Sequence, residues 1–419
     1  MGQYIIEGCN KLGGSVRVQG AKNSALPILA ATVAVGRPCI IHNCPDLSDI
    51  CSTVKILESL GCEVHRGNNM IAVDSSKLSK KKISDVLMRE MRSSIIFLGA
   101  LLSATGEAVM SAPGGCDIGL RPIDIHLMAL RKLGVDICEK HGELRCRCRK
   151  LRGGKVVLPF PSVGATENII LASVKANGIT TIINAAREPE IVDLAMFLNS
   201  CGARISGAGE STVVVEGVER LYSSQYAIMP DRIVAGTYMA AAAVTGSTII
   251  IEEVISSHLV PVISVLEQAG CKIEASGSKL RITAPHKLKA FDRIRTMPYP
   301  GFPTDCQAII MAVASVCDGI TIISENIFEN RFRHICELKR MGADIRVQER
   351  IAVVNGVDCL QGAFVRSTDL RAGAALVVAG LCAEGVTTVD KICYIDRGYD
   401  SLAENLSALG AIIKRKENI

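Results

Sequence analysis

A six-fold internal repeat is the feature that most narrows how this chain can fold. In each copy an alanine-rich apolar helix ends at a glycine, and a β-branched strand, a loop, an amphipathic helix and a second glycine follow. The first glycines stand 66 to 73 residues apart, at Gly36, Gly106, Gly178, Gly246, Gly319 and Gly385. The second stand 68 to 73 residues apart, at Gly61, Gly134, Gly202, Gly270, Gly342 and Gly410. Two matched series predict an α/β architecture of six equivalent repeats.

The glycine after each helix predicts how that helix ends. A glycine at the C′ position adopts the left-handed conformation, so we expect positive φ at all twelve positions. The first helix of each repeat is apolar on nearly every face and is therefore predicted to be buried. These helices are expected at residues 23–35, 93–105, 166–177, 233–245, 306–318 and 372–384.

Two features predict how the repeats form domains. The longest stretch near the middle without a helical pattern is 216–231, which separates three repeats from three. The sixth repeat is expected to end in a hairpin, and it lacks the strand that follows other repeats; residues 15–18 have the form of that strand. We predict a first domain at 22–229 and a second made of 1–21 and 230–419, because an unpaired strand edge would otherwise remain.

The composition favours a globular protein that handles small anions. The 419 residues are 48% hydrophobic and 21% charged, with a net charge of +5 and only 4% aromatic residues. Mild positive charge suits anionic substrates, whereas so few rings offer little for nucleic-acid bases to stack on. The 17 cysteines are odd in number and scattered, which is typical of reduced thiols in a cytoplasmic protein. Residues 233–251 are uncharged and long enough to span a membrane, but the repeat predicts a helix, a turn and a strand there.

Polar and charged residues stand at the starts of the apolar helices. They are Lys22, Asn23, Arg92, Ser93, Ser162, Thr166, Asp231, Arg232, Thr304, Asp305, Asp369 and Arg371. Ordinary capping is an alternative explanation for the Ser, Thr, Asp and Asn members. It does not explain the cations, because a cation at a helix start opposes the helix dipole and a bound anion would offset that cost. If the repeats are arranged symmetrically, these starts predict an anion-binding cleft between the domains.

One thiol differs from the others in its surroundings. The segment from Ser111 to Arg121 reads SAPGGCDIGLR and places Cys116 among three glycines, directly before Asp117. Glycine lets such a backbone move and approach a ligand closely. The ordinary alternative is a structural thiol, but such thiols stand in apolar helices and strands. Arg121 favours the thiolate and Asp117 the thiol. We interpret the segment as a catalytic lid.

Other signals indicate no cofactor. Cys138, His141, Cys146 and Cys148 could bind zinc, but their spacing fits no strong pattern and a hairpin is the favoured interpretation. The basic run at 145–155 has no interleaved aromatic residues, so a solvated strand face is favoured over a nucleic-acid groove. The sequence contains no P-loop and no GxGxxG motif. We therefore expect neither a metal nor a cofactor.

Taken together, these motifs resemble those of the enolpyruvyl transferases, and most closely the UDP-N-acetylglucosamine 1-carboxyvinyltransferases. The resemblance covers the whole chain and is carried by Gly20-Ala-Lys-Asn23, Pro113-Gly-Gly-Cys-Asp-Ile-Gly-Leu-Arg-Pro-Ile-Asp124, Ser162-Val-Gly-Ala-Thr166, Pro230-Asp-Arg232, Phe302-Pro-Thr-Asp305, Glu325-Asn-Ile-Phe-Glu-Asn-Arg331, Asp369-Leu-Arg371 and Asp396-Arg-Gly398. It implies two inside-out α/β barrel-like domains, each of three repeats of about 70 residues, with the active site in the interdomain cleft. Phe160 and Ser48 depart from the pattern, since some members have a basic residue at each position.

The resemblance also implies a reaction. Members of this family transfer the enolpyruvyl group of phosphoenolpyruvate to the 3-hydroxyl of UDP-N-acetylglucosamine and release phosphate, through a tetrahedral ketal. This is the first committed step of peptidoglycan synthesis, and so of cell-wall biogenesis, cell shape and cell division. Bringing two anions together needs a preorganised positive field, which suits the cations described above. No nucleic acid, membrane or obligate protein partner is implied.

By resemblance, chemical roles fall on matching positions. Cys116 is implied as the proton donor to C3 of phosphoenolpyruvate, as the site of a covalent adduct and as the target of fosfomycin. Asp305 is implied as the base for the sugar hydroxyl, and Asn23 as the group that orients it. The implied phosphoenolpyruvate contacts are Lys22, Arg121 and Arg397 for the phosphate and Arg331 and Arg371 for the carboxylate end. The implied nucleotide-sugar contacts are Arg92, Arg121, Pro122, Ile123, Asp124, Ile125, Ser162, Val163, Gly164 and Ile327.

Two other functions stay open at this point. The sister transferase that acts on shikimate 3-phosphate shares the fold, but the Pro-Gly-Gly-Cys lid and the Ser-Val-Gly-Ala-Thr segment argue against it. A non-catalytic binding or regulatory relative is the other. The presence of Lys22, Cys116, Asp305 and Arg397 argues against that function.

Overall fold

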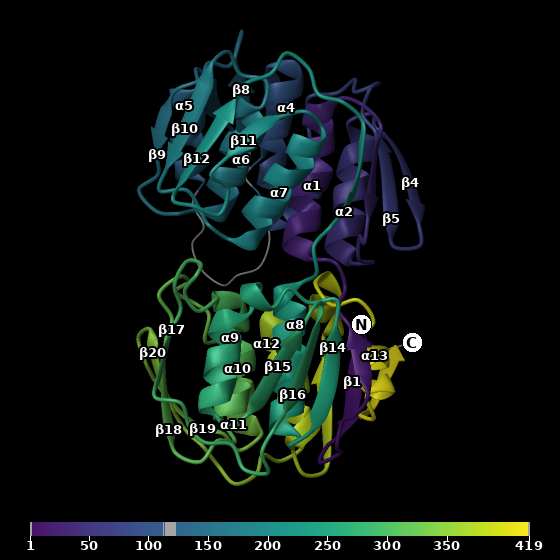
Figure 1. Cartoon of the computed structure of the whole chain (residues 1–419), viewed down its shortest axis with the longest axis vertical. Helices are drawn as coiled ribbons and strands as arrows, with labels where there is room; N and C mark the ends of the chain where they lie inside the picture. Colours follow the sequence, from purple (N-terminus) through teal and green to yellow (C-terminus); the bar gives the residue numbers. More distant parts are fainter. Residues whose placement is uncertain (1, 112, 114–122, 418–419) are drawn as a thin grey trace. The chain divides into compact units, whose positions relative to one another are not determined.

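The computed structural model describes residues 2–111, 113 and 123–417 (Figure 1). Contacts between Cα atoms divide these residues into two compact lobes. The first lobe is the described part of Gly20–Met229, and the second takes in the chain up to Gln19 and from Pro230 onward. Each lobe has its own hydrophobic core and contains three of the six repeats.

Three apolar helices form the centre of the first lobe (Figure 1). They are α1 (Lys22–Val35), α4 (Phe97–Thr105) and α6 (Val163–Ser173), and each packs against the other two. Every residue of α1 except Asn23 is buried. Such burial on all faces is what a helix without a polar stripe requires, so the predicted buried helices are confirmed here.

Amphipathic helices and small sheets surround this centre. The outer helices are α2 (Ser48–Ser59), α3 (Asp85–Glu90), η1 (Arg92–Ile96), α5 (Asp124–Lys132) and α7 (Pro189–Ser200). The first sheet has the order β13 (Ser224–Ala227), β3 (Cys39–His42), β5 (Met70–Asp74) and β4 (Glu63–Gly67). The second has the order β6 (Glu107–Ser111), β8 (Glu143–Arg147) and β7 (Asp136–Lys140). The third has the order β11 (Arg204–Ser206), β12 (Thr212–Glu216), β10 (Ile179–Ile183) and β9 (Lys155–Val157).

The second lobe repeats this plan. Its central helices are α8 (Arg232–Val244), α10 (Thr304–Ala314) and α12 (Leu370–Cys382), which also pack on one another. Around them lie η2 (Ser256–His258), α9 (Val260–Gln268), α11 (Ile335–Arg340), η3 (Ile392–Arg397) and α13 (Leu402–Ala408). One sheet has the order β15 (Lys272–Ser276), β16 (Lys279–Thr283), β14 (Thr248–Glu252) and β2 (Ser15–Arg17). The others are β17 (Arg293–Arg295), β18 (Ile320–Ser324), β20 (Ile351–Asn355) and β19 (Asp344–Gln348), and β21 (Phe364–Arg366), β22 (Val386–Asp390), β1 (Gly2–Glu7) and β23 (Ile412–Glu417).

In each lobe, the sheet of the first repeat gains an edge strand from a segment outside that repeat. In the first lobe β13, which follows the third repeat, pairs in parallel with β3 of the first repeat. In the second lobe β2, which precedes all the repeats, pairs in parallel with β14 of the fourth repeat. The N-terminal segment thereby supplies a strand to the second lobe.

The expectation of a hairpin at the end of the sixth repeat is wrong. β23 is the last strand described, and its partner is β1, which lies antiparallel between β22 and β23. β1 therefore takes the place that the second hairpin strand has in the other repeats.

The glycine prediction is confirmed at all twelve positions. Their φ angles are positive and range from 58° at Gly246 to 117° at Gly319. The predicted helix bounds need correction, because residues 93–96 belong to η1 and three helices end two to four residues early. In those three repeats the residue predicted to end the helix forms a parallel bridge with the preceding loop. The bridges join Arg152 to Asn177, Lys289 to Asp318 and Gln361 to Glu384.

The stretch at 233–251 forms α8, a turn and β14, as predicted. Within the described ranges, the structure has no helix with the length and apolar character that crossing a membrane demands.

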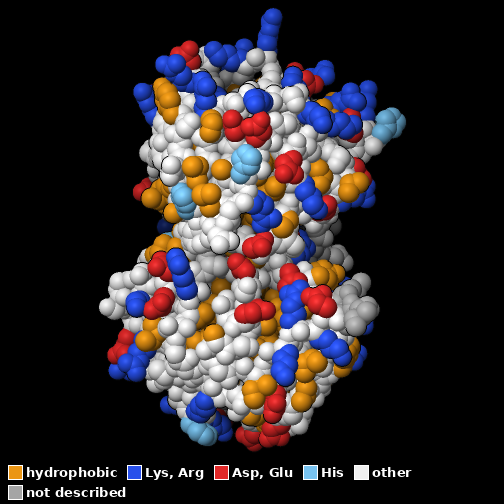
Figure 2. Space-filling view, turned by 90° about the vertical axis from the view of Figure 1, so that its right-hand side faces the viewer, with side chains coloured by type: hydrophobic (Ala, Val, Ile, Leu, Met, Phe, Trp, Pro, Cys, Tyr) orange, Lys and Arg blue, Asp and Glu red, His pale blue; other side chains and the backbone are white. Residues whose placement is uncertain are grey.

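The basic run of the second repeat lies on and after β8, where its first members are exposed and paired. Arg145 binds Glu143 and Arg147 binds Glu107, each at 2.7 Å. On the face shown in Figure 2, side chains of both charge signs are present on each lobe. These pairs agree with the predicted solvated strand face. Cys138 is exposed whereas Cys146 is buried, and the described part of the chain holds no group of three His, Cys, Asp or Glu side chains placed for a metal ion.

Candidate functional site

Asp305 and two arginines form a charged cluster in the second lobe. Asp305 is the second residue of α10, Arg371 is the second residue of α12, and Arg331 follows β18 in the fifth repeat. Nη2 of Arg331 donates to Oδ1 of Asp305 at 2.8 Å. Nε and Nη2 of Arg371 donate to Oδ2 at 3.2 and 3.1 Å. One carboxylate thus binds both guanidinium groups through separate oxygens.

The two arginines of this cluster are buried far more deeply than the carboxylate. The exposed fractions of the side chains are 4% for Arg331, 3% for Arg371 and 29% for Asp305. Burial alone would lower the pKa of Arg371, but Asp305, Tyr399 and Asp231 raise it above its ordinary value. The guanidinium group of Arg371 therefore stays charged, and the acid between the two arginines faces solvent in part.

Aromatic rings and donor atoms complete the surroundings of the two cations. The guanidinium carbon of Arg331 lies 5.6 Å from the centre of the Phe328 ring, and that of Arg371 lies 5.5 Å from the Tyr399 ring. These distances are within the range of cation–π attraction. Nε of Arg331 and Nη1 of Arg371 are buried and have no hydrogen-bond partner among the described residues. The cluster could therefore accept a further anion at these donors.

Glu325 organises the loop that leads to Arg331. Its carboxylate is buried and accepts hydrogen bonds from the backbone N–H of Ile327 at 2.8 Å and of Phe328 at 3.1 Å. It also accepts from the hydroxyl of Thr304, at 3.0 Å, directly before Asp305. Glu325 belongs to a motif that carries the family resemblance, but the sequence assigned no role to it. The half-buried Ile327 is held in place by this carboxylate.

Ordinary capping explains two of the acids at helix starts. Asp231 accepts from the backbone N–H groups of Ile233 and Val234, and Asp369 accepts from those of Arg371 and Ala372. Both carboxylates are buried and satisfy helix ends that would otherwise lack partners. The alternative weighed from the sequence is therefore correct at these positions. Asp305, by contrast, binds side-chain cations.

Arg397 is the last residue of η3 and is half-buried. It lies in the same lobe as Asp305, in the loop of the sixth repeat that corresponds to the loop carrying Arg331 in the fifth. The preceding residue, Asp396, binds Arg415 through two hydrogen bonds of 2.8 and 2.9 Å.

In the first lobe, Lys22 begins α1 and binds a buried acid. Its Nζ lies 2.6 Å from Oδ2 of Asp49 in α2, with 10% of the lysine side chain and 6% of the aspartate side chain exposed. Asn23 beside it is exposed. The pairing with Asp49 was not predicted, because Asp49 stands in an ordinary amphipathic helix. It accounts for a cation at a helix start, since a nearby carboxylate offsets the charge.

Apart from Ile327, the described residues that are predicted to contact a nucleotide sugar lie at three element starts of the same lobe. Arg92 begins η1, is half-buried, and donates from Nη1 to the carbonyl of Pro113 at 3.3 Å. Burial lowers the pKa of Arg92 from its ordinary value. Ile123, Asp124 and Ile125 form the start of α5, with Asp124 exposed. The third group is Ser162, which caps α6, followed by Val163 and Gly164.

Three residues of the predicted site lie outside the described residues: Cys116, Arg121 and Pro122. The lid interpretation of the segment from Ser111 to Arg121 therefore stays a prediction. Within the described residues, the structure brings Asp305, Arg331 and Arg371 into direct contact.

A buried acid of the first lobe was also missed from the sequence. Glu167 of α6 is buried, and burial, followed by the charges of Glu190 and Glu188, raises its pKa well above the ordinary value. Burial and neighbouring negative charge both favour the protonated form of this carboxyl group.

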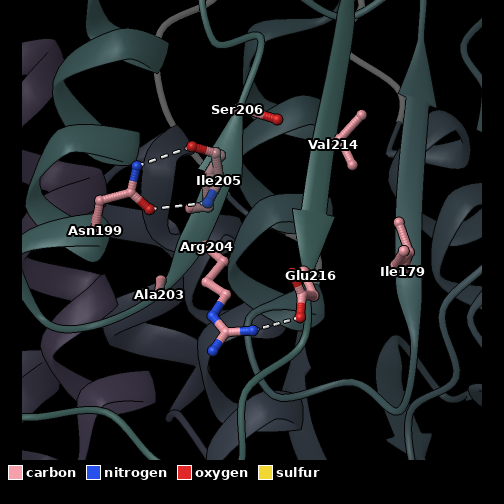
Figure 3. A pocket seen from close by; sticks show the side chains of 8 residues that line it. All are labelled: Ile179, Asn199, Ala203, Arg204, Ile205, Ser206, Val214 and Glu216. Atoms are coloured by element: carbon pink, nitrogen blue, oxygen red, sulfur yellow. Dashed lines mark hydrogen bonds and ion pairs between the residues drawn. The ribbon is translucent and has the colours of Figure 1, made fainter.

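A pocket of the first lobe is lined by none of these residues (Figure 3). It has a volume of about 300 Å³ and is lined by Ile179, Asn199, Ala203, Arg204, Ile205, Ser206, Val214 and Glu216. Its charged residues, Arg204 and Glu216, already pair with each other and are well exposed. Asn199 is occupied by two hydrogen bonds to the backbone of Ile205. The pocket thus has no convergent, unsatisfied polar groups, and it is not the candidate site.

Comparison with known proteins identifies the class. The family model described as EPSP synthase (3-phosphoshikimate 1-carboxyvinyltransferase) matches residues 6–406. The solved structure of the enolpyruvyl transferase NikO from Streptomyces tendae aligns with a TM-score of 0.89 at 26% identity, over 100% of this chain and 99% of that one. EPSP synthase from Acinetobacter baumannii aligns with a TM-score of 0.76 at 19% identity over the full length of both chains, which supports the fold alone. The chain thus has the fold of the enolpyruvyl transferases and belongs to the EPSP synthase family.

Curated relatives narrow the class further. A protein of Caldanaerobacter subterraneus subsp. tengcongensis named UDP-N-acetylglucosamine 1-carboxyvinyltransferase 2 is 52% identical over 99% of this chain and 100% of its own length. A protein of Gloeobacter violaceus named UDP-N-acetylglucosamine 1-carboxyvinyltransferase is 48% identical over 98% of this chain and 90% of its own length. The chain belongs to the UDP-N-acetylglucosamine 1-carboxyvinyltransferases, within the EPSP synthase family.

Proposed function

We propose that this protein transfers the enolpyruvyl group of phosphoenolpyruvate to the 3-hydroxyl of UDP-N-acetylglucosamine and releases phosphate. The reaction is the first committed step of peptidoglycan synthesis, which links the protein to cell-wall biogenesis, cell shape and cell division. The observation that carries the proposal is the pair of buried arginines bound to Asp305, in a chain with full-length relatives of that name. Such a pair suits a substrate with a carboxylate.

The geometry of the Asp305 cluster suggests how the acid could change partners. Arg331 and Arg371 are proposed to bind the carboxylate of phosphoenolpyruvate, yet in this structure they bind Asp305. Their buried donors without partners, Nε of Arg331 and Nη1 of Arg371, are available to an incoming carboxylate. Its arrival would weaken their hold on Asp305, which could then act as a base. Lys22, Arg121 and Arg397 are proposed to bind the phosphate.

The proposed reaction balances in two steps. In the addition, the 3-oxygen of the sugar bonds to C2 of phosphoenolpyruvate, Asp305 takes the hydroxyl proton, and Cys116 gives a proton to C3. In the elimination, the tetrahedral ketal loses phosphate from C2 and a proton from C3, which restores the double bond. The surrounding cations stabilise the charge that develops on the phosphate and carboxylate oxygens. Asn23 is proposed to orient the sugar hydroxyl.

The nucleotide sugar is proposed to bind mainly the first lobe. The contacts would be Arg92, Arg121, Pro122, Ile123, Asp124, Ile125, Ser162, Val163 and Gly164, joined by Ile327. We also propose that the two lobes are the domains predicted at 22–229 and at 1–21 with 230–419. The protein is proposed to act in the cytoplasm, where both substrates are made, and to form an adduct with phosphoenolpyruvate or with fosfomycin at Cys116.

Phosphate release tests the proposed activity. The purified protein is incubated with phosphoenolpyruvate and either UDP-N-acetylglucosamine or shikimate 3-phosphate, and inorganic phosphate is measured over time. We expect release with the nucleotide sugar only. Release with shikimate 3-phosphate alone would refute the proposal, and no release with either acceptor would favour a non-catalytic role.

A further inference from the structure

A buried hydrogen-bond network in the first lobe joins the three segments that carry the proposed nucleotide-sugar contacts. Its centre is Asn168 of α6, whose side chain is fully buried. Oδ1 of Asn168 accepts from the backbone N–H of Gly99 in α4 at 2.7 Å. Nδ2 donates to the carbonyl of Ile95 in η1 at 3.1 Å and contacts Nδ1 of His126 in α5 at 2.8 Å. One amide therefore connects α6 with η1, α4 and α5.

These contacts fix the tautomer of His126. A backbone N–H can only donate and a carbonyl can only accept, so Gly99 and Ile95 determine which atom of the Asn168 amide is the oxygen. Nδ2 is therefore a donor, and Nδ1 of His126 must accept from it. A neutral imidazole that accepts at Nδ1 carries its hydrogen on Nε2. Burial, and next the charge of Arg92, lower the pKa of His126 to about 4, although Asp124 has a weaker opposing effect. The ring is therefore neutral at pH 7.

The other side of this imidazole lies against Gly164. A Cβ atom built on Gly164 would lie 3.1 Å from Cε1 and 3.4 Å from Nε2 of His126. Gly164 lies in the first turn of α6, where its backbone does not require glycine. The ring therefore accounts for the glycine in the Ser-Val-Gly sequence, because a side chain there would press on it.

We propose that Asn168 and His126 are positioning residues for the nucleotide-sugar site. Asn168 fixes the tautomer and plane of the His126 ring, and the ring sets the distance between the start of α5 and Gly164. Neither residue is proposed to touch the reacting atoms. The inference rests on the proposed function, since it concerns the acceptor substrate of that reaction.

Steady-state kinetics of two variants test the proposal. Asn168→Asp removes both donated hydrogen bonds, and His126→Asn keeps an acceptor toward Asn168 but removes the ring beside Gly164. In each we expect KM for UDP-N-acetylglucosamine to rise about tenfold or more, since about 1.4 kcal/mol of lost positioning corresponds to a tenfold change. We expect kcat and KM for phosphoenolpyruvate to stay within about threefold, because none of the described phosphoenolpyruvate contacts belongs to this network.

The matched control is Asn199→Asp, shown in Figure 3. Asn199 is an amide in the same lobe that binds the backbone of Ile205 through two hydrogen bonds of 2.9 Å, remote from the proposed contacts. Its KM for the nucleotide sugar should match that of the wild type. If Asn168→Asp or His126→Asn leaves that KM unchanged, or lowers kcat and raises both KM values equally, the positioning role is refuted.

A double-mutant cycle separates positioning from general damage. Gly164→Ala should raise KM for UDP-N-acetylglucosamine in the wild type, where the ring opposes the new methyl group. In His126→Asn the same change should cost less, because the ring is gone. Additive effects would overturn the proposed contact between the ring and Gly164.

The ring itself can be observed without turnover. With ¹⁵N-labelled histidine, the signal lost in His126→Asn identifies His126 among the seven histidines. At pH 7 we expect the pattern of a neutral ring protonated on Nε2, and a change of that pattern in Asn168→Asp. If the protein does not use UDP-N-acetylglucosamine but shows this signature, the proposed function is refuted and the hydrogen-bond network stands. An active protein with the hydrogen on Nδ1 would refute the network instead.

Discussion

Replacing Asp305 by alanine should destabilise the second lobe, in addition to its expected effect on turnover. The substitution removes three hydrogen bonds of 2.8 to 3.2 Å and leaves Arg331 and Arg371 as buried cations without their shared acid. The guanidinium groups are 4% and 3% exposed, so water cannot replace the carboxylate fully. The destabilisation follows from burial of the partners that remain.

The structure gives the size of this effect. Breaking a buried ion pair by removing one partner costs about 3–5 kcal/mol. Because Asp305 is 29% exposed, water reaches the vacated position, and we take the lower end, about 3 kcal/mol. For a unit of this size, each kcal/mol shifts Tm by about 2–4 °C, so Tm should fall by about 6–12 °C.

Calorimetry measures this change, and Asp396→Ala is the matched control. Asp396 has a similarly exposed side chain, 30%, and also accepts two hydrogen bonds from an arginine of the same lobe. Its partner, Arg415, is 37% exposed, so removing the acid should cost only about 0–1 kcal/mol. Equal falls in Tm for the two variants would refute the argument from burial.

Phosphoenolpyruvate provides a second measurement on the same variant. If its carboxylate competes with Asp305 for the two arginines, the substrate should raise Tm more in Asp305→Ala than in the wild type, since the donors are vacant. An equal rise in both proteins would mean that the carboxylate binds elsewhere.

Three further predictions concern other parts of the site. Cys116→Ser should abolish or strongly reduce turnover, whereas titration calorimetry should find UDP-N-acetylglucosamine binding nearly intact. Cys138→Ser is the control, and turnover of Cys116→Ser equal to that of this control would exclude the thiol as proton donor. Lys22→Met should lower kcat/KM for phosphoenolpyruvate by about 10²–10³-fold in steady-state assays, because a buried cation is lost and Asp49 remains. The pKa of Glu167 is raised in the folded state, so the folded protein retains a proton that the unfolded chain releases as pH rises above the ordinary carboxyl pKa. Glu167→Gln removes this effect, and its Tm relative to the wild type should increase between pH 5 and pH 8; a difference independent of pH would contradict the reasoning.

Local rules made much of the fold predictable. Gly246 and Gly319 illustrate this, because a helix end selects glycine for its backbone conformation, and that selection leaves a mark in the sequence at every repeat. The burial of α1 was equally predictable, since a helix that is apolar on all faces is stable only in the protein core.

Pairings between distant residues were not predictable in the same way. Asp305 stands 26 residues from Arg331 and 66 from Arg371. The packing of α10 on α12 brings Asp305 to Arg371, and the loop after β18 brings Arg331 to the same carboxylate. Lys22 likewise acquires Asp49 through the packing of α1 on α2. Such contacts leave no periodic signal in the sequence. The resemblance to a family identified the site residues, but it did not show which side chains bind one another.

The position of β1 has a consequence for synthesis of the chain. β1 lies between β22 and β23, so its two partners are made about 380 and about 410 residues after it. At typical rates of translation the strand waits roughly 20 to 80 s, long enough for the first lobe to fold on the ribosome. During that interval β1 presents unpaired edges, and its apolar residues would be exposed to chaperones. We therefore expect the second lobe to complete its folding after the first lobe.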